Sequence, residues 1–364
     1  MTSPQPRPAV IATPFDRHGS ITPAELEALG LSGDAIVDFS LSVNPYGPPP
    51  GVRAVLEAID IARYPDPDAL ALRRALATHL HRPLSQIIVG NGSAELLWLI
   101  ALAFLDAGHR ALIIGPTFGE YARAVRLMGA EIVTWRTDER DDFAIQPDEI
   151  AVLLAQTRPK VVFICHPNNP TGRLLPLQAL ARWAAAHPAT LFVVDEAYLP
   201  FAPNAPTALT LDAANILVLR SMTKVHALAG LRLGYAVGDE AIIQALRRVQ
   251  PPWSVNALAQ AAGVAALQDE AHLRTSLAKL AAAKEALLQA LRAQGWRPLP
   301  SAANFFLLPV DDATACRARL LEQGVVVRDC ASFGLPRHIR IAVRTPAENE
   351  CLLWALSKVK KCLE

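Results

Sequence analysis

The stretch ILVLRSMTKVHALAGLRLGYAVG, residues 216–238, contains two strand-like segments separated by a turn that carries a lysine. Its first segment, residues 216–220, is almost entirely apolar, which is typical of a strand buried on both faces of a parallel sheet. Lys224 follows this segment, Arg232 comes eight positions later, and no acidic side chain occurs in the stretch. Most lysines lie on solvated faces. The stretch therefore predicts a parallel α/β fold and makes Lys224 a candidate functional residue.

The same alternation extends along the chain in both directions. Apolar, β-rich runs are separated by alanine- and leucine-rich helical patterns, and this order is typical of a mainly parallel sheet with helices on both faces. These runs predict an α/β fold with a seven-stranded sheet. The predicted strands are 87–90, 111–115, 131–135, 160–165, 190–194, 216–220 and 234–238.

A second, smaller domain is expected after this sheet. Two prolines in residues 250–257 end one helical pattern, and another begins beyond them. Three β-like runs with helical patterns between them then predict a compact α+β domain. We expect residues 1–44 to form an N-terminal arm that joins the small domain, residues 45–256 the large domain and residues 257–364 the small domain.

Composition and charge exclude several classes of protein. With 35 Lys and Arg against 34 Asp and Glu, the net charge of +1 gives no reason to expect nucleic acid or an anionic membrane as a partner. The longest apolar run, residues 96–105, is about half of a membrane span of roughly 20 residues, so we expect a buried helix there. Five scattered cysteines without CxxC spacing argue against a metal site and favour a reducing, cytoplasmic location.

Polar residues of unusual kinds follow four of the predicted strands. The turns are NGS at 91–93, HPNNPTG at 166–172, DEAY at 195–198 and SMTK at 221–224. Each turn taken alone is also explained as a helix cap or an ordinary loop. In open α/β sheets, however, ligands bind at the carboxyl ends of the strands. Together the turns supply an amine, a carboxylate, an amide, a phenol and a helix N-terminus that can bind phosphate, a set that suits pyridoxal 5′-phosphate.

Three segments resemble the signature segments of the fold-type I enzymes that depend on pyridoxal 5′-phosphate, the class I/II aminotransferase superfamily. They are PNNPTG at 167–172, DEAY at 195–198 and SMTKVHALAGLRLGY at 221–235. The resemblance covers nearly the whole chain. It implies a homodimer in which the cofactor lies at the carboxyl edge of the sheet.

The resemblance also implies a role for each polar residue near the cofactor ring. Lys224 would hold the cofactor covalently, and Asp195 would pair with the protonated pyridine nitrogen. Asn169 and Tyr198 would hydrogen-bond the 3-oxygen of the ring.

A further set of residues would contact the face and the phosphate of the cofactor. Phe118 of the segment GPTFGEY is expected to stack on the ring, in preference to Tyr121. The resemblance implies that the phosphate is held by backbone N–H groups and side chains of Gly92, Ser93, Ser221, Arg232 and, from a second subunit, Tyr64.

Two arginines of the predicted small domain are candidates for substrate binding. Arg328 and Arg344 lie at or near the ends of predicted strands, and guanidinium groups suit carboxylate and phosphate oxygens. They therefore predict a substrate with more than one negative charge, although a pairing with an acidic neighbour would also explain either residue. Arg337 and Arg340 are interpreted as surface charges.

Within the superfamily, three segments resemble the threonine-phosphate decarboxylases of cobalamin biosynthesis. They are residues 17–49, 251–269 and 326–356. This resemblance implies decarboxylation of O-phospho-L-threonine to (R)-1-amino-2-propanol O-phosphate, with His18 and Asn44 lining the substrate site. One departure is visible, because His-Gly-Ser-Ile stands where that family usually has His-Gly-Gly-Asn.

Two other functions remain open at this point. Histidinol-phosphate aminotransferases share the cofactor site, the two arginines and a phosphorylated amine substrate. Cofactor chemistry does not separate the two reactions, because the orientation of the substrate decides which bond breaks. A transcription regulator built on the same fold would need a DNA-binding domain before it, and only about 36 residues that are not basic precede the first segment of the fold.

Overall fold

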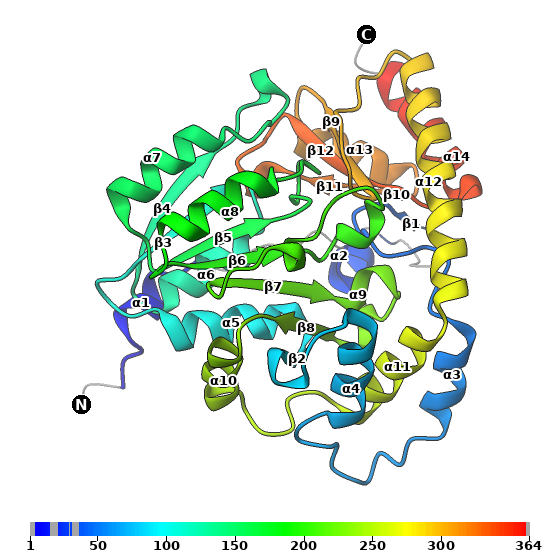
Figure 1. Cartoon of the computed structure of the whole chain (residues 1–364). Coiled ribbons are helices and arrows are strands. Elements are labelled where there is room, and N and C mark those ends of the chain that lie inside the picture. Colours follow the sequence, from blue (N-terminus) through cyan, green and yellow to red (C-terminus); the bar gives the residue numbers. More distant parts are fainter. Residues whose placement is uncertain (1–3, 15–20, 29, 31–35, 362–364) are drawn as a thin grey trace.

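A twisted sheet of seven strands forms the centre of the larger lobe in the computed structural model, which describes residues 4–14, 21–28, 30 and 36–361 (Figure 1). β8 is antiparallel to both of its neighbours, and the other strands run parallel to one another. In spatial order the strands are β2 (Ile87–Asn91), β8 (Leu233–Val237), β7 (Ile216–Ser221), β6 (Leu191–Asp195), β5 (Val161–Cys165), β3 (Arg110–Gly115) and β4 (Glu131–Arg136). The predicted mainly parallel seven-stranded sheet is therefore confirmed.

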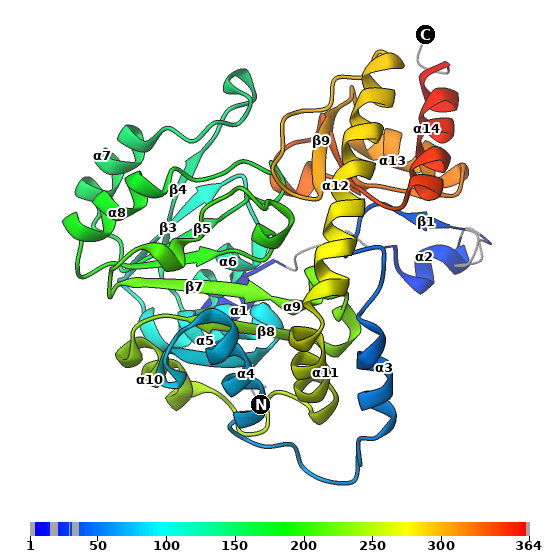
Figure 2. The ribbon, with the colours of Figure 1, turned by 45° about the vertical axis from the view of Figure 1, so that its right-hand side comes forward.

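Helices cover both faces of this sheet because its central strands are apolar on both faces. In β5, Val161 and Phe163 pack in one core cluster while Val162 and Ile164 pack in another. The first cluster includes side chains of α5 (Gly92–Phe104), α6 (Gly119–Leu127) and α10 (Glu240–Val249). The second includes side chains of α7 (Pro147–Thr157) and α8 (Leu177–Ala186), and Figure 2 shows the two layers. The expected buried helix at 96–105 is α5, and no helix among the described residues is long and apolar enough to cross a membrane.

The smaller lobe contains a three-stranded antiparallel sheet in the order β11 (Arg328–Asp329), β12 (His338–Ala342) and β9 (Phe305–Pro309). α13 (Ala313–Glu322), α14 (Pro346–Lys361) and the C-terminal part of α12 (Glu270–Ala293) share its core. The chain before the large lobe contributes β1 (Val37–Asp38), which pairs in parallel with β10 (Val325–Val326). The described residues before β1 include the short helices α1 (Pro8–Ala12) and α2 (Pro23–Ala28).

One boundary differs from the expected domain division. The helical pattern from residue 257 forms two helices, α11 (Ala257–Gln268) and α12, with the Asp269 carboxylate accepting the amide of His272 at the start of α12. α11 packs on α3 (Pro50–Glu57) and α4 (Leu70–Leu80) in the core of the large lobe. Residues 257–268 therefore lie with the large lobe. A boundary at 257 falls one helix too early, because a helical pattern shows which face is buried and not which lobe buries it.

Candidate active site

The carboxyl ends of three neighbouring strands meet at one edge of the large sheet. β5 ends at Cys165, β6 at Asp195 and β7 at Ser221. Cys165 and Asp195 lie side by side, since they are register partners in the sheet. β8 runs in the opposite direction, so it begins at this edge immediately after Arg232, and β2 ends there at Asn91. The topology therefore gathers the four polar turns around one cavity of about 120 Å³, which is lined by Ser93, Ala94, Phe118, Tyr121, Cys165, Asn169, Asp195, Ala197, Tyr198, Ser221, Thr223, Lys224 and Arg232.

Lys224 lies in the short helix α9 (Met222–Val225) with its amine in this cavity. Burial, followed by the positive charges of Arg340 and Arg232, lowers the pKa of Lys224 to about 8. Its Nζ makes no ion pair or hydrogen bond within the described part of the chain. Near neutral pH this amine is therefore neutral and nucleophilic far more often than the amine of an exposed lysine.

Asp195 supplies a carboxylate to the same cavity. Its Oδ2 accepts a hydrogen bond of 2.7 Å from the hydroxyl of Tyr121, and its Oδ1 accepts the amide of Ala197 at 3.0 Å. Burial raises the pKa of Asp195, and the bond from Tyr121 partly offsets that effect. The ring of Tyr121 stacks on Phe163 at 5.3 Å, which fixes its hydroxyl. A buried carboxylate whose hydrogen-bond partners are neutral is suited to pair with a cationic ring nitrogen.

Phe118, Asn169 and Tyr198 complete the walls around these two groups. Phe118 lies at the start of α6 and packs edge-on against Tyr121, at 5.7 Å between centroids. Tyr198 is buried, packs edge-on against Phe305 of the small lobe at 4.9 Å, and burial raises its pKa to about 12. The structure thus places Phe118 on the cavity wall and uses Tyr121 to support Asp195.

The far end of the cavity is lined by groups that bind anions. Gly92 begins α5 with a φ of +75°, and a Cβ there would come within 3.0 Å of the Arg232 Nη2. Gly234 allows equally close packing, since its Cβ would lie 2.4 Å from the amide nitrogen of Ser93. The hydroxyl of Ser221 pairs with that of Thr223 at 2.7 Å. A helix N-terminus, two hydroxyls and a guanidinium are groups of the kinds that bind phosphate in proteins.

These features fit pyridoxal 5′-phosphate on the structure's own evidence. The cavity offers an amine without a partner, a buried carboxylate with only neutral donors, and a cationic end built from Gly92 and Arg232. Thr223 belongs to this set although it is not among the site residues expected from the sequence. Its place in the turn SMTK, beside Ser221, was the available signal. No group of three His, Cys, Asp or Glu in the described ranges is placed to hold a metal.

A second cavity of about 400 Å³ opens from the first toward the small lobe, and Asn169, Tyr198, Lys224 and Arg232 line both. Arg340 of β12 is buried in its wall. Its Nη1 donates to the Asn169 Oδ1, its Nη2 donates to the Ser40 carbonyl at 2.7 Å, and its buried Nε has no hydrogen-bond partner among the described residues. The interpretation of Arg340 as a surface charge is wrong.

Arg328 lines the same cavity, where the sequence analysis expects a substrate-binding arginine. Its Nη2 donates to the hydroxyl of Ser332 at 2.7 Å, and its guanidinium lies over the ring of Phe333 at 5.2 Å. Burial, followed by the charge of Arg340, lowers the pKa of Arg328. Two mutually repelling guanidinium groups at one cavity favour a ligand that carries negative charge. Arg337 is exposed and lies near Asp311, as expected of a surface charge.

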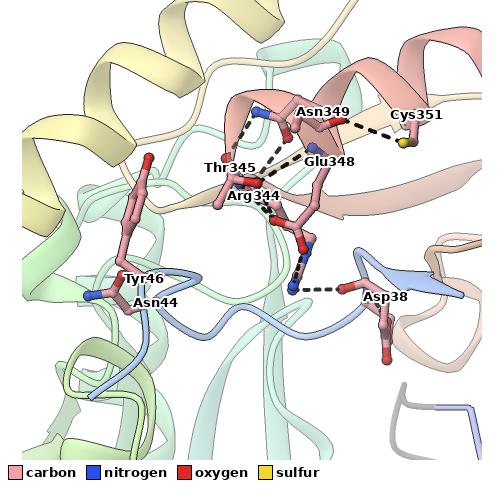
Figure 3. Close-up of polar contacts among 10 residues, drawn as sticks. Asp38, Asn44, Tyr46, Arg344, Thr345, Glu348, Asn349 and Cys351 are labelled. Atoms are coloured by element: carbon pink, nitrogen blue, oxygen red, sulfur yellow. Dashed lines mark hydrogen bonds and ion pairs between the residues drawn. The ribbon is translucent and has the colours of Figure 1, made fainter. Parts of the chain in front are cut away.

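Arg344 is placed elsewhere (Figure 3). Its Nε donates to the Glu348 Oε1 at 2.8 Å, and its Nη1 donates to the carbonyl of Asp38 at 3.2 Å. It lines neither cavity. The structure therefore corrects the expected substrate-binding role of Arg344: this side chain ties α14 to β1, and Arg340 takes the position expected for it.

Asn44 and Tyr64, which are also expected at the site, lie outside both cavities of this chain. The side chain of Asn44 is buried outside both cavities and donates to the Val225 carbonyl at 3.0 Å and the Ser276 hydroxyl at 2.9 Å. The expected contact of Asn44 with substrate is thus corrected to support of the segment that carries Lys224. Tyr64 is 82% exposed and packs against Trp253, so it makes no contact with the cavity of its own chain. His18 lies outside the described residues.

The chain belongs to the class I and II aminotransferases, whose family model matches residues 35–356. It is 39% identical over 355 residues to a threonine-phosphate decarboxylase of Salmonella typhimurium, covering 94% of this chain and 96% of that protein. It is 35% identical to a histidinol-phosphate aminotransferase of Moorella thermoacetica, covering 89% and 85% of the two chains.

The fold agrees with that assignment. The crystal structure of histidinol-phosphate aminotransferase from Sinorhizobium meliloti in complex with pyridoxal 5′-phosphate matches 100% of this chain and 99% of that one, with a TM-score of 0.88 and 26% identity. The family and the cavity together identify pyridoxal 5′-phosphate as the cofactor.

Proposed function

We propose that this enzyme decarboxylates O-phospho-L-threonine to (R)-1-amino-2-propanol O-phosphate and CO2, in corrinoid biosynthesis. The observation that carries the proposal is Arg340, a buried guanidinium that lines the same cavity as Lys224 and whose hydrogen-bond partners among the described residues are neutral. A buried charge without a counter-charge is costly, so a bound anion would stabilise it. Arg328 supplies a second cation, which matches a substrate with both a carboxylate and a phosphate. The 39% identity to a threonine-phosphate decarboxylase gives further support.

Each cofactor-site residue has a role in this proposal. When bound, pyridoxal 5′-phosphate withdraws the electrons left on Cα by the bond that breaks. Lys224 would hold the cofactor covalently and, as a free ammonium group, would deliver a proton to Cα. Asp195 would keep the ring nitrogen protonated, and Asn169 and Tyr198 would orient the 3-oxygen. The anion-binding end is formed by Gly92, Ser93, Ser221, Thr223 and Arg232.

The arginines determine how the substrate lies over the ring. The bond that breaks is the one held perpendicular to the ring plane, so the positions of the anionic groups select between loss of CO2 and loss of the Cα proton. Arg328 of β11 and Arg340 of β12 are register partners on adjacent strands. They therefore hold two anionic groups of the substrate at a fixed spacing.

Transamination of histidinol phosphate is the second candidate. It is favoured by the match to the Sinorhizobium meliloti structure and by the 35% identity to the Moorella thermoacetica enzyme. Its substrate is also a phosphorylated amine. The same two arginines would bind, in turn, the phosphate of that substrate and the carboxylate of the amino donor.

Two separate incubations distinguish these candidates. The holoenzyme is given O-phospho-L-threonine alone and, separately, histidinol phosphate with 2-oxoglutarate. We expect CO2 and aminopropanol phosphate from the first and no glutamate from the second. Glutamate from the second mixture, with no CO2 from the first, would replace the proposal by the aminotransferase.

We propose in addition that the protein is a homodimer located in the cytoplasm. Ile61 and Tyr64 are each 82% exposed, and Trp253 packs against Tyr64, so an apolar surface is available for a second copy. Cys165, Cys316 and Cys330 are buried free thiols, which suits a reducing compartment. Light scattering of the eluted protein would test the dimer, and a monomer at micromolar concentration would contradict it.

A further inference from the structure

The turn that follows β11 lies at the mouth of the substrate cavity. It consists of the short helix η7 (Ala331–Phe333) and Gly334. Ser332 and Phe333 line the cavity together with Arg328, and Ser332 is exposed there. The proposed mechanism gives these two residues no task.

The hydroxyl of Ser332 is oriented by the neighbouring arginine. It accepts a hydrogen bond of 2.7 Å from the Arg328 Nη2, so one of its lone pairs is occupied by a cationic donor. A serine hydroxyl also carries one proton to donate, and no acceptor for that proton is present among the residues that the structure describes. The proton of Ser332 is therefore available to a ligand oxygen beside Arg328.

The position of the turn is fixed from two sides. The ring of Phe333 packs under the Arg328 guanidinium at 5.2 Å, and its carbonyl accepts a hydrogen bond of 2.8 Å from the Nη2 of Arg136, at the end of β4 in the large lobe. Gly334 has a φ of +73°, and a Cβ there would lie 2.9 Å from the same Arg136 nitrogen. The small-lobe turn is thus docked closely on the large lobe, and Ser332 is held in a defined place.

We propose that Ser332 is a specificity-determining residue that selects a phosphate ester over a carboxylate at this end of the substrate. A planar carboxylate presents two oxygens, which a guanidinium can satisfy alone. A phosphate monoester presents three terminal oxygens in a tetrahedral arrangement, and the hydroxyl donates to an oxygen that Arg328 leaves unpaired. The inference rests on the proposed function only in requiring a phosphorylated substrate, which both candidate reactions use.

The test uses two ligands of similar shape that lack an amine and so cannot enter either reaction. Isopropyl phosphate and isobutyrate are titrated into the holoenzyme by calorimetry at pH 8. In Ser332→Ala we expect the Kd of isopropyl phosphate to rise about tenfold, because a hydrogen bond to a charged oxygen is lost, while the Kd of isobutyrate changes less than about twofold. Ser332→Thr, which keeps the hydroxyl, is expected to stay close to the wild type.

Ser357→Ala, at a half-buried serine of α14 that lines neither cavity, serves as the matched control and should change neither Kd. The inference would be overturned if Ser332→Ala lost affinity for both ligands equally or for neither. It would also be overturned if the wild-type protein did not bind isopropyl phosphate. Failure of the proposed decarboxylation gives a different result. In that case O-phospho-L-threonine is not turned over, but the preference for isopropyl phosphate and its dependence on Ser332 persist.

Discussion

The cofactor cavity and the substrate cavity share Lys224 but are built in different ways. The cofactor cavity takes its polar groups from turns at one edge of one sheet, and Asp195 has its hydrogen-bond partners within the same lobe. The substrate cavity joins the segment 40–42, the start of α6 and the strands of the small lobe. Its geometry therefore depends on how the lobes are placed against each other, whereas the hydrogen bonds that hold Asp195 do not. Substitutions in the two regions should affect different measurements.

Lys224→Ala gives the largest expected effect. Without the amine the cofactor has no covalent attachment, and activity should fall by about 10³-fold or more. The measurement combines turnover with the absorbance of the dialysed protein, in which the band of the attached cofactor should be missing. Lys160→Ala, at an exposed lysine, is the control and should keep both turnover and the absorbance band of the attached cofactor. A stable attached-cofactor band in Lys224→Ala would contradict the assignment.

Arg340→Met tests the substrate side and has Arg344→Met as its matched partner. Loss of the buried Arg340 guanidinium should lower kcat/KM by about 10²- to 10³-fold, mainly through KM, while cofactor affinity changes little. Arg344 forms a partly exposed ion pair with Glu348, so its loss should cost about 1 kcal/mol of stability or less and reduce kcat/KM by less than about tenfold. Steady-state kinetics and thermal unfolding of both variants provide the comparison. The reverse ranking would restore Arg344 as the substrate-binding residue.

The two regions also differ in how far the sequence predicts them. Asp195, Asn169, Lys224 and Gly92 each lie at or just after the end of an apolar strand, and parallel strands bring such positions to one edge of a sheet. The seven strands and these four residues could therefore be predicted from residue order, and the family resemblance supplied the proposed role of each residue.

The substrate side could not be predicted in the same way. Arg340 lies within β12, which is paired on both sides and buried on both faces. The alternation of apolar and polar residues along this strand therefore does not show which face lines the cavity. A charged residue inside the run HIRIA was the available signal, because a buried guanidinium needs a function or a partner. Arg344 lies after the strand, four residues before Glu348, and that spacing favoured the ion pair.

The pH dependence of cofactor binding shows how the two regions are coupled. Burial and then the charges of Arg340 and Arg232 lower the pKa of Lys224 to about 8. Because only the neutral amine is nucleophilic, the rate at which the apoprotein captures the cofactor should rise about tenfold per pH unit below that value and level off above it. Stopped-flow absorbance measures this rate. Arg340→Met should move the midpoint upward, since a neighbouring cation is removed; a midpoint near that of an exposed lysine in the wild type would contradict the burial argument.

Asn44→Ala has the smallest expected effect on activity and separates structural support from substrate binding. The variant leaves the Val225 carbonyl without its donor and should lower the free energy of unfolding by about 1–2 kcal/mol. Asn215→Ala is the matched control, because its Nδ2 likewise supports the backbone, donating to three backbone carbonyls, and it lines neither cavity. Chemical denaturation and steady-state kinetics should show comparable losses of stability in the two variants, with KM changed less than about threefold. A KM increase confined to Asn44→Ala would return that side chain to the substrate site, and it would mean that the lobes close further around the substrate than the cavity shown here.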